Sequence, residues 1–90
     1  MVRQKDNPSS MQKDNTNILR ALILFNDDVN TFEFVIDSLI EVCKHEPEQA
    51  EQCALVAHFK GKCPVKDGDY YTLKPYHDEM SLRGLIVSIE

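Results

Sequence analysis

The chain has 90 residues, of which 42% are hydrophobic and 28% charged, and 15 acidic against 10 basic residues give a net charge of -5. A chain of this length forms one small domain that buries only about 60 to 65% of its unfolded surface, so we expect no deep, enclosed active site. The acidic balance argues against nucleic acid, whose phosphates need a basic face, and favours a cationic ligand or a basic partner surface.

The first 17 residues, MVRQKDNPSSMQKDNTN, are polar. They contain too few apolar side chains to offset the entropy of ordering, so we predict a flexible N-terminal arm at residues 1–17 and a folded domain at residues 18–90. An ordinary frayed terminus is the alternative. No apolar core of a signal peptide and no membrane-span-like window occur in the sequence, and we expect a cytoplasmic protein.

A strand followed by an amphipathic helix is predicted for the first part of the domain. Ile18–Phe25 is a short apolar run bounded by Asn on both sides, which suits a buried strand, although its Leu and Ala residues also allow a helix. Asn30 with Glu33 three residues later is a capping pattern that starts a helix over Phe32–His45. The apolar stripe of this helix consists of Phe32, Val35, Ile36, Leu39, Val42 and Cys43.

A second helix and a short strand follow. Pro47 suits the first position of a helix, and Gly61 offers its C-terminal stop. Small residues line one face of this helix and let its neighbour approach closely: Ala50, Cys53, Ala54 and Ala57. Lys62–Lys66 is predicted as a strand, followed by a turn at residues 67–69.

A third helix and a closing strand complete the chain. Tyr71–Arg83 is predicted as a helix with Pro75 in its first turn and Gly84 after its end, and Leu85–Glu90 is the clearest strand. The inward residues of this helix are Leu73, Tyr76 and Met80, with His77 as a further candidate. The order β-α-α-β-α-β predicts an α+β fold, a small sandwich with a three-stranded antiparallel sheet packed on three helices.

Asn26, Asp27 and Asp28 concentrate polar groups between the first strand and the first helix. A helix N-terminus favours a nearby carboxylate by about 0.3 to 1 kcal/mol. One carboxylate satisfies that need, and Asn30 is available as the cap. The three side chains therefore exceed what capping requires.

A calcium loop is a second interpretation of this segment. Its ligands would come from Asn26, Asp28, Asn30 and Asp37. The interpretation fails because Thr31 stands where the loop needs glycine, and two phenylalanines lie inside the coordinating segment. We expect no metal and no cofactor.

The histidine and cysteine residues form no recognisable catalytic motif. His58 ends the second helix, where a histidine is more often a hydrogen-bonded, half-buried residue than a ligand or base. Cys43, Cys53 and Cys63 contain no C-x-x-C pair, and we interpret them as small buried residues of a protein in a reducing compartment. A hydrolase built from His58, an aspartate and Cys53 or Cys63 would lack a recognisable nucleophile elbow, so we expect no enzyme.

Two motifs together resemble the ClpS family of protease adaptors. Asn26-Asp27-Asp28 is followed by Glu33-Phe34-Val35 and, further along, by His58-Phe59-Lys60-Gly61-Lys62, where the family reads roughly N-D-D-x-T-x-M-E-F-V and A-V-H-x-x-G-K. The resemblance covers about Ile18 to Glu90. It implies a fold like the C-terminal domain of the large-subunit ribosomal stalk protein, with a third helix shortened or repositioned because residues 58–85 form a shorter segment than in many relatives.

The resemblance also implies a function. ClpS-type adaptors bind proteins that begin with Leu, Phe, Tyr or Trp, the bacterial N-degrons, and hand them to a ClpA- or ClpC-type AAA+ unfoldase that works with the ClpP protease. By position, Asn26, Asp28 and His58 would accept the three N–H donors of the ligand's α-ammonium, and Asp27 would help to hold the loop or the peptide backbone. The unfoldase N-terminal domain and N-degron proteins are the implied partners, with no nucleic acid and no membrane, and we expect a monomer.

The family's hydrophobic pocket carries over with changes. The matching positions are Leu24, Asn30, Phe32, Val35, Ala54, Ala57 and Leu85. Asn30 stands where Thr is usual, Phe32 where a gatekeeper Met is usual, Ala54 where Met is common, and Ala57 where Val is common. Our hypothesis is that the two alanines offset the bulk of Phe32, so that the pocket is reshaped rather than filled. This leaves open the order of preferred N-terminal residues and the acceptance of β-branched ones.

Two alternatives remain at this point. In the first, Phe32 is a core residue and the pocket is closed. In the second, the chain is a ClpS-like or stalk-like interaction module that binds no N-degron. The second would not require a free amino group on its ligand.

Overall fold

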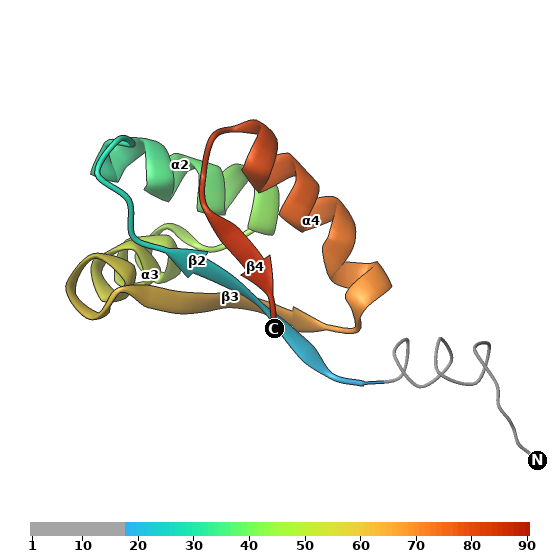
Figure 1. The fold of residues 1–90 in the computed structure, drawn as a ribbon. Helices are drawn as coiled ribbons and strands as arrows, with labels where there is room; N and C mark the ends of the chain where they lie inside the picture. Colours follow the sequence, from blue (N-terminus) through green and yellow to red (C-terminus); the bar gives the residue numbers. More distant parts are fainter. Residues whose placement is uncertain (1–17) are drawn as a thin grey trace, which may run out of the picture.

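The computed structural model describes residues 18–90, which form three helices and three strands (Figure 1). In chain order the elements are β2 (Arg20–Phe25), α2 (Phe32–Cys43), α3 (Pro47–Lys60), β3 (Lys62–Gly68), α4 (Tyr70–Leu82) and β4 (Val87–Ile89). The strands form one antiparallel sheet in the order β3-β2-β4. The predicted α+β fold is therefore confirmed. The predicted arm, residues 1–17, lies outside the described residues.

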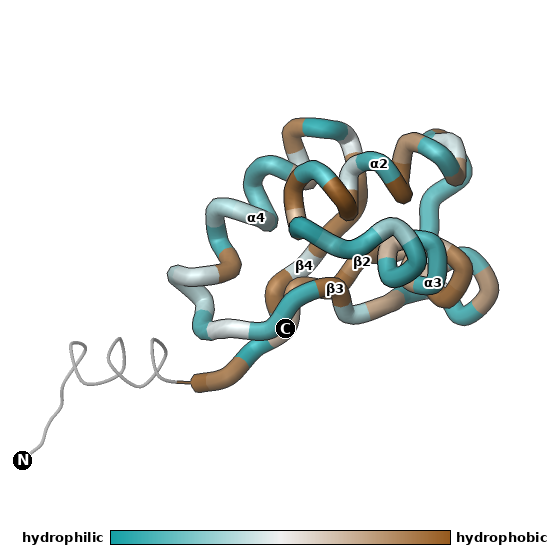
Figure 2. Tube along the Cα trace, turned by 180° about the vertical axis from the view of Figure 1, so that it is seen from behind, coloured by the Kyte–Doolittle hydropathy of each residue, from teal (hydrophilic) through white to brown (hydrophobic). Residues whose placement is uncertain are grey.

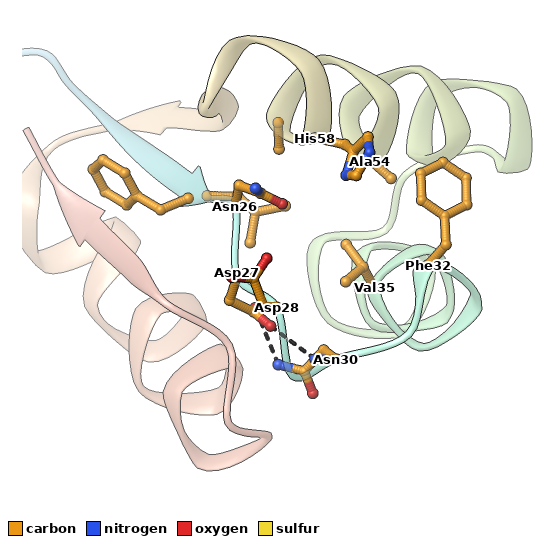
Figure 3. Close-up of a pocket in the computed structure, with 11 residues that line it drawn as sticks. Asn26, Asp27, Asp28, Asn30, Phe32, Val35, Ala54 and His58 are labelled. Carbon is orange, nitrogen blue, oxygen red and sulfur yellow. Dashed lines mark hydrogen bonds between the residues drawn. The ribbon is translucent and has the colours of Figure 1, made fainter.

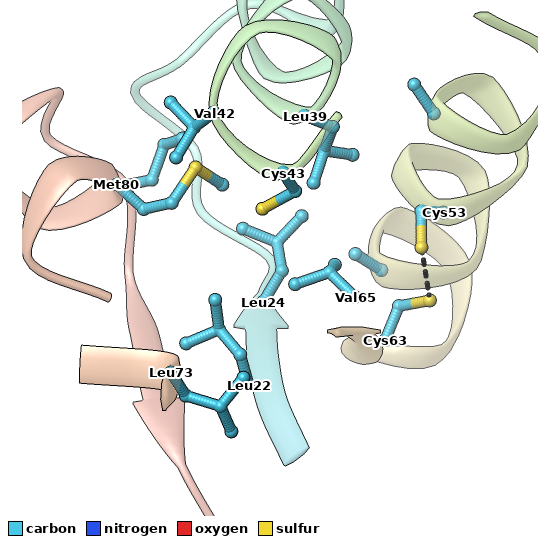
Figure 4. Packing of buried hydrophobic residues seen from close by; sticks show 13 residues of the cluster. Leu22, Leu24, Leu39, Val42, Cys43, Cys53, Cys63, Val65, Leu73 and Met80 are labelled. Atoms are coloured by element: carbon cyan, nitrogen blue, oxygen red, sulfur yellow. Dashed lines mark hydrogen bonds between the residues drawn. The ribbon is translucent and has the colours of Figure 1, made fainter. Parts of the chain in front are cut away.

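The core lies between the sheet and the helices and is centred on β2. Leu22 and Leu24 of this middle strand are 0% and 1% exposed. Figure 4 shows them surrounded by side chains of the helices and of β3: Leu39, Val42, Cys43, Val65, Leu73 and Met80. Each fully buried leucine or methionine contributes about 1.5 to 3 kcal/mol. The strand whose end leads to Asn26-Asp27-Asp28 is thus held firmly by its neighbours.

The helices are amphipathic to different degrees. Along the tube in Figure 2, hydrophilic and hydrophobic residues alternate within α2 and α4, as expected for helices with one face on a core. The face of α3 that packs inward carries small residues, as predicted: Ala50, Cys53, Ala54 and Ala57 are all buried. None of the helices within residues 18–90 has both the length and the hydrophobicity that a membrane-spanning helix needs.

The three cysteines are free and buried, which confirms their predicted burial. The Sγ atoms of Cys53 on α3 and Cys63 on β3 lie 3.0 Å apart (Figure 4). Burial, reinforced by this contact with Cys63, raises the pKa of the Cys53 thiol to about 12. Because the thiolate is the nucleophilic form of cysteine, Cys53 is poorly suited to attack a substrate at neutral pH.

Several predicted boundaries are wrong by a few residues. β3 continues to Gly68, through the predicted turn, because residues 67 and 68 still pair with Ala21 and Arg20 of β2. α2 ends at Cys43 rather than at His45, since Lys44 adopts a left-handed conformation with φ 61.

The third helix also begins earlier than predicted. The Asp69 carboxylate accepts a hydrogen bond from the Thr72 backbone N–H at 2.8 Å and so caps α4. This cap starts the helix at Tyr70, which places Pro75 inside the helix and not in its first turn. His77, expected as a candidate inward residue, instead lies partly exposed with Nδ1 3.0 Å from an Asp78 carboxylate oxygen.

Candidate functional site

The polar motif lies where β2 ends, and two backbone hydrogen bonds fix its start. Phe25 N–H donates to the Ile86 carbonyl at 2.9 Å, and Asn26 N–H donates to the Gly61 carbonyl at 3.0 Å. The first bond ties the strand end to the segment before β4, and the second ties it to the turn between α3 and β3. From Asn26 the chain then runs as a loop to α2 (Figure 3).

Asp27 organises this loop from within. Its Oδ1 accepts hydrogen bonds from the backbone N–H groups of Val29 at 2.9 Å and Asn30 at 2.7 Å, and its Oδ2 accepts one from Asn30 Nδ2 at 3.1 Å. Burial raises the pKa of the Asp27 carboxyl, but the hydrogen bonds from Asn30 and Val29 outweigh it, so the net pKa lies below its usual value of 3.8. Because the pKa of Asp27 is lower in the folded protein, its hydrogen bonds stabilise the fold above pH 3.8. This stabilisation is lost as the pH falls through the pKa that Asp27 has in the folded state.

The predicted cap of α2 is wrong. Asn30 and Glu33 form the sequence pattern of a capping box, yet Thr31 is the N-cap, and its Oγ1 accepts a hydrogen bond from Phe34 N–H at 3.1 Å. The carboxamide of Asn30 is engaged elsewhere, with Asp27 and with the Gly84 carbonyl.

Asp28, Asn26 and His58 differ from Asp27 in that their side chains are exposed and uncommitted. Within residues 18–90 none of these three side chains takes part in a hydrogen bond with the protein. The His58 ring packs edge to face against Phe59, with ring centroids 4.8 Å apart. Their oxygen and nitrogen acceptors are therefore available to a ligand.

These side chains surround a cavity of about 440 Å³ (Figure 3). Its lining residues are Leu24, Phe25, Asn26, Asp27, Asp28, Asn30, Phe32, Val35, Ala54, Ala57 and His58. The polar residues come from the loop and from the end of α3, and the apolar residues come from β2, α2 and α3. Such a cavity, apolar with a few convergent polar groups, is typical of small-ligand sites, which usually measure about 300 to 1,000 Å³.

The sequence-predicted residues meet at this cavity with one exception. The three candidate amine-binding residues, Asp27 and every candidate pocket residue other than Leu85 line it. Leu85 is 4% exposed and belongs to the core, where its N–H donates to the Met80 carbonyl at the end of α4. Phe25 lines the cavity although we did not predict it; its position directly before Asn26 is the signal that could have identified it.

Phe32 forms one wall of the cavity without filling it. It is the first residue of α2, it remains 36% exposed, and Figure 3 shows its ring standing beside Ala54 of α3. Ala54 and Ala57 are 3% and 4% exposed and present only methyl groups to this space. Phe32 is thus not a core residue, and the cavity is open.

Within residues 18–90 no group of three or more His, Cys, Asp or Glu side chains is arranged to hold a metal ion. What the cavity does offer is a set of hydrogen-bond acceptors beside an apolar space. A ligand that joins a cationic hydrogen-bond donor to a large apolar group matches both parts.

Comparisons with known proteins agree on one family. The family model described as ATP-dependent Clp protease adaptor protein ClpS matches residues 17–84. The ClpS adapter protein of Erwinia tasmaniensis is 39% identical over 78 residues, which cover 84% of this chain and 66% of that protein. The one from Escherichia coli O1:K1 is 39% identical over 61 residues, covering 68% of this chain and 50% of that protein. The match thus spans two thirds or less of these relatives' lengths.

A solved structure shares the fold. The structure of Agrobacterium tumefaciens ClpS2 bound to L-phenylalaninamide has a TM-score of 0.68 to this one, with 24% sequence identity, and the match covers 80% of this chain and 94% of that one. At this identity the likeness establishes the arrangement of helices and strands alone.

Proposed function

The chain belongs to the ClpS family of ATP-dependent Clp protease adaptors, and on this premise we propose that it binds proteins with a free N-terminal Leu, Phe, Tyr or Trp. It then delivers them to a ClpA- or ClpC-type unfoldase that works with ClpP, and it performs no catalysis itself. The observation that carries the proposal is the cavity at the end of β2, where three uncommitted acceptor side chains meet an apolar space.

The acceptors suit an α-ammonium group. Asn26 Oδ1, the Asp28 carboxylate and a ring nitrogen of His58 can accept the three N–H donors of the ammonium. Each charge-assisted hydrogen bond contributes about 1.5 to 3 kcal/mol, and a donor left unpaired after water is excluded costs about as much. Asp27 holds the loop in this scheme, because its carboxylate is already occupied by Asn30 and Val29.

The apolar part of the cavity suits a large N-terminal side chain. Leu24, Val35 and Ala57 line it, and burial of a Leu or Phe side chain contributes about 1.5 to 3 kcal/mol. L-phenylalaninamide, the ligand in the Agrobacterium ClpS2 structure, joins a free α-amine to a benzyl group, which is the same chemistry. After association costs of several kcal/mol, a Kd around 1 μM, or about -8 kcal/mol, is expected.

Binding should weaken at high pH. A free α-amine has a pKa of about 7.7 to 8.0, so affinity for a Phe-initiated peptide falls as the pH rises above that range and the ligand loses its positive charge. Fluorescence anisotropy between about pH 5 and 9.5 measures the profile. A flat profile would remove charge recognition from the proposal.

Delivery to the unfoldase involves the N-terminal arm in this proposal. We expect that deleting residues 1–16 leaves peptide affinity unchanged and slows degradation of a bound cargo by the reconstituted unfoldase and protease. Peptide anisotropy and cargo fluorescence measure the two activities separately. Loss of both activities to the same extent, or of neither, would contradict this division of labour.

The unfoldase N-terminal domain contacts the folded domain, and the exposed Glu46, Glu48 and Glu51 on α3 and its cap are candidate contacts. The adaptor acts as a cytoplasmic monomer, without nucleic acid or membrane. A stalk-like module with an altered pocket is the alternative, and it would bind partners whether or not their amino group is free.

A further inference from the structure

We propose that Asn30 is a positioning residue for the amine-binding side chains. Its carboxamide ties the loop between β2 and α2 to the turn between α4 and β4, and thereby sets where Asp28 lies relative to His58. This role rests on the proposed function of the cavity. Asn30 also lines the cavity, and the role proposed here is the separate one that its carboxamide has through the loop.

Asn30 uses both N–H bonds of one amide nitrogen. Nδ2 donates to Asp27 Oδ2 at 3.1 Å and to the Gly84 carbonyl at 3.0 Å. The second bond joins residues 54 positions apart in the sequence. One planar group therefore links the centre of the loop to a different element of the fold.

The acceptor at Gly84 is itself held in place. Gly84 N–H donates to the Ser81 carbonyl at 2.9 Å, and Leu85 N–H donates to the Met80 carbonyl at 3.1 Å, so the chain around Gly84 is fixed to the end of α4. Met80 is fully buried and anchors that end in the core. Gly84 has φ 86, a left-handed conformation in which glycine is favoured. The carbonyl is thus a fixed reference point for the loop.

The loop has no comparable support at Asp28. Asn26 is tied to Gly61 by its backbone N–H, and Asp27 is tied to Asn30. Within the described residues nothing bonds to the Asp28 carboxylate between these two anchors. Its position follows from the backbone alone, and that backbone depends on the bonds of Asn30.

The view of the site supports an indirect role. Figure 3 shows Asn30 at the far end of the loop from Asn26 and from His58, with its carboxamide nitrogen turned toward Asp27. Both donors of that nitrogen are engaged. A threonine at this position would have one hydroxyl proton, which can serve Asp27 or Gly84 but not both.

The test compares Asn30→Ala and Asn30→Thr with the wild type, using C-terminally labelled peptides that begin with Phe or Leu. Loss of one to two net hydrogen bonds at about 1 kcal/mol each predicts that Asn30→Ala weakens both peptides about 5- to 30-fold. Asn30→Thr should give a smaller loss, and the ratio of the Phe and Leu affinities should not change in either variant. Gln52→Ala removes an exposed carboxamide on α3 outside the cavity and serves as the control.

Hydrogen exchange separates positioning from a general loss of stability. In Asn30→Ala the backbone amides of Val29 and residue 30, which donate to Asp27 Oδ1, should exchange faster, while those of β2 stay protected. Unchanged peptide affinity in Asn30→Ala, or a changed ratio of the affinities for the Phe and Leu peptides, would overturn the positioning role of Asn30. If Asn30→Ala does not fold, Asn30→Thr decides by the same criteria. A wild-type protein that binds neither peptide would overturn the proposed function, and the positioning role with it.

Discussion

Replacing Asp28 with Asn should weaken binding of a Phe-initiated peptide by about 10- to 100-fold. The substitution keeps the shape of the side chain and an oxygen acceptor, but it removes the charge that strengthens the bond to the ammonium, and such bonds contribute about 1.5 to 3 kcal/mol. The fold should be unaffected, because within residues 18–90 the Asp28 carboxylate bonds to no other group. Anisotropy titration and a thermal melt measure the two effects.

Asp37→Asn is the matched control for this prediction. Asp37 is an exposed carboxylate on α2 that does not line the cavity, so its substitution changes the net charge by the same amount at a different place. We expect it to leave affinity within about twofold of the wild type, because Asp37 makes no contact in the cavity and salt screens the attraction of an exposed charge. Equal losses in both variants would mean that general attraction, and not a contact at Asp28, holds the peptide.

The second large effect is expected at Ala54. Ala54→Met puts a long side chain beside the ring of Phe32 and fills the space that would receive the ligand's side chain. The loss of about 1.5 to 3 kcal/mol of side-chain burial predicts that affinity for a Phe-initiated peptide falls about 10- to 150-fold. Combining it with Phe32→Ala should restore much of the binding, since removal of the neighbouring ring reopens the space.

Gln52→Met, on the exposed side of α3, is the control for the effect of an added methionine. Thermal melts of Ala54→Met measure whether the buried position 54 tolerates the larger side chain. A double variant that binds as weakly as Ala54→Met would show that the two walls do not share one space. Wild-type affinity in Ala54→Met would contradict the compensation between Phe32 and the alanines. A peptide beginning with Val, titrated against the same variants, reports how the reshaped wall treats β-branched side chains.

Two adjacent carboxylates have different tasks in this site. Asp27 is satisfied by three donors from its own loop, and these hydrogen bonds lower its pKa. Asp28 receives no donor from residues 18–90 and faces the cavity region. The excess of negative charge at the end of β2 thus divides into one group that holds the loop and one that lines the cavity without a bond to residues 18–90.

Local patterns were enough to predict the fold. The helical stripe of α2 and the small-residue face of α3 specify their elements by periodicity, and Pro47 and Gly61 mark two boundaries. The apolar run at β2 suited a strand but also allowed a helix. The motif residues could be grouped into one candidate site because the resemblance supplied their spacing. The structure then brought them around one cavity.

What could not be predicted depends on contacts between distant segments. Asn30 and Thr31 are both good N-caps by residue type. In the structure the carboxamide of Asn30 bonds to Asp27 and to the distant Gly84, and Thr31 is the N-cap. The exposure of Phe32 likewise depends on how α2 packs against α3. From the sequence alone, an aromatic residue at the start of an apolar stripe is expected to be buried in the core. Leu85 matched a pocket position by sequence, but the end of α4 carries it into the core.

The most direct test of the account compares a labelled peptide that begins with Phe with the same peptide N-acetylated. Acetylation removes the positive charge and two of the three N–H donors and leaves the benzyl side chain unchanged. We predict a Kd near 1 μM for the free peptide and a loss of at least about 100-fold on acetylation, corresponding to two or more charge-assisted hydrogen bonds. Equal affinity for the two peptides would contradict recognition of the α-amine by Asn26, Asp28 and His58.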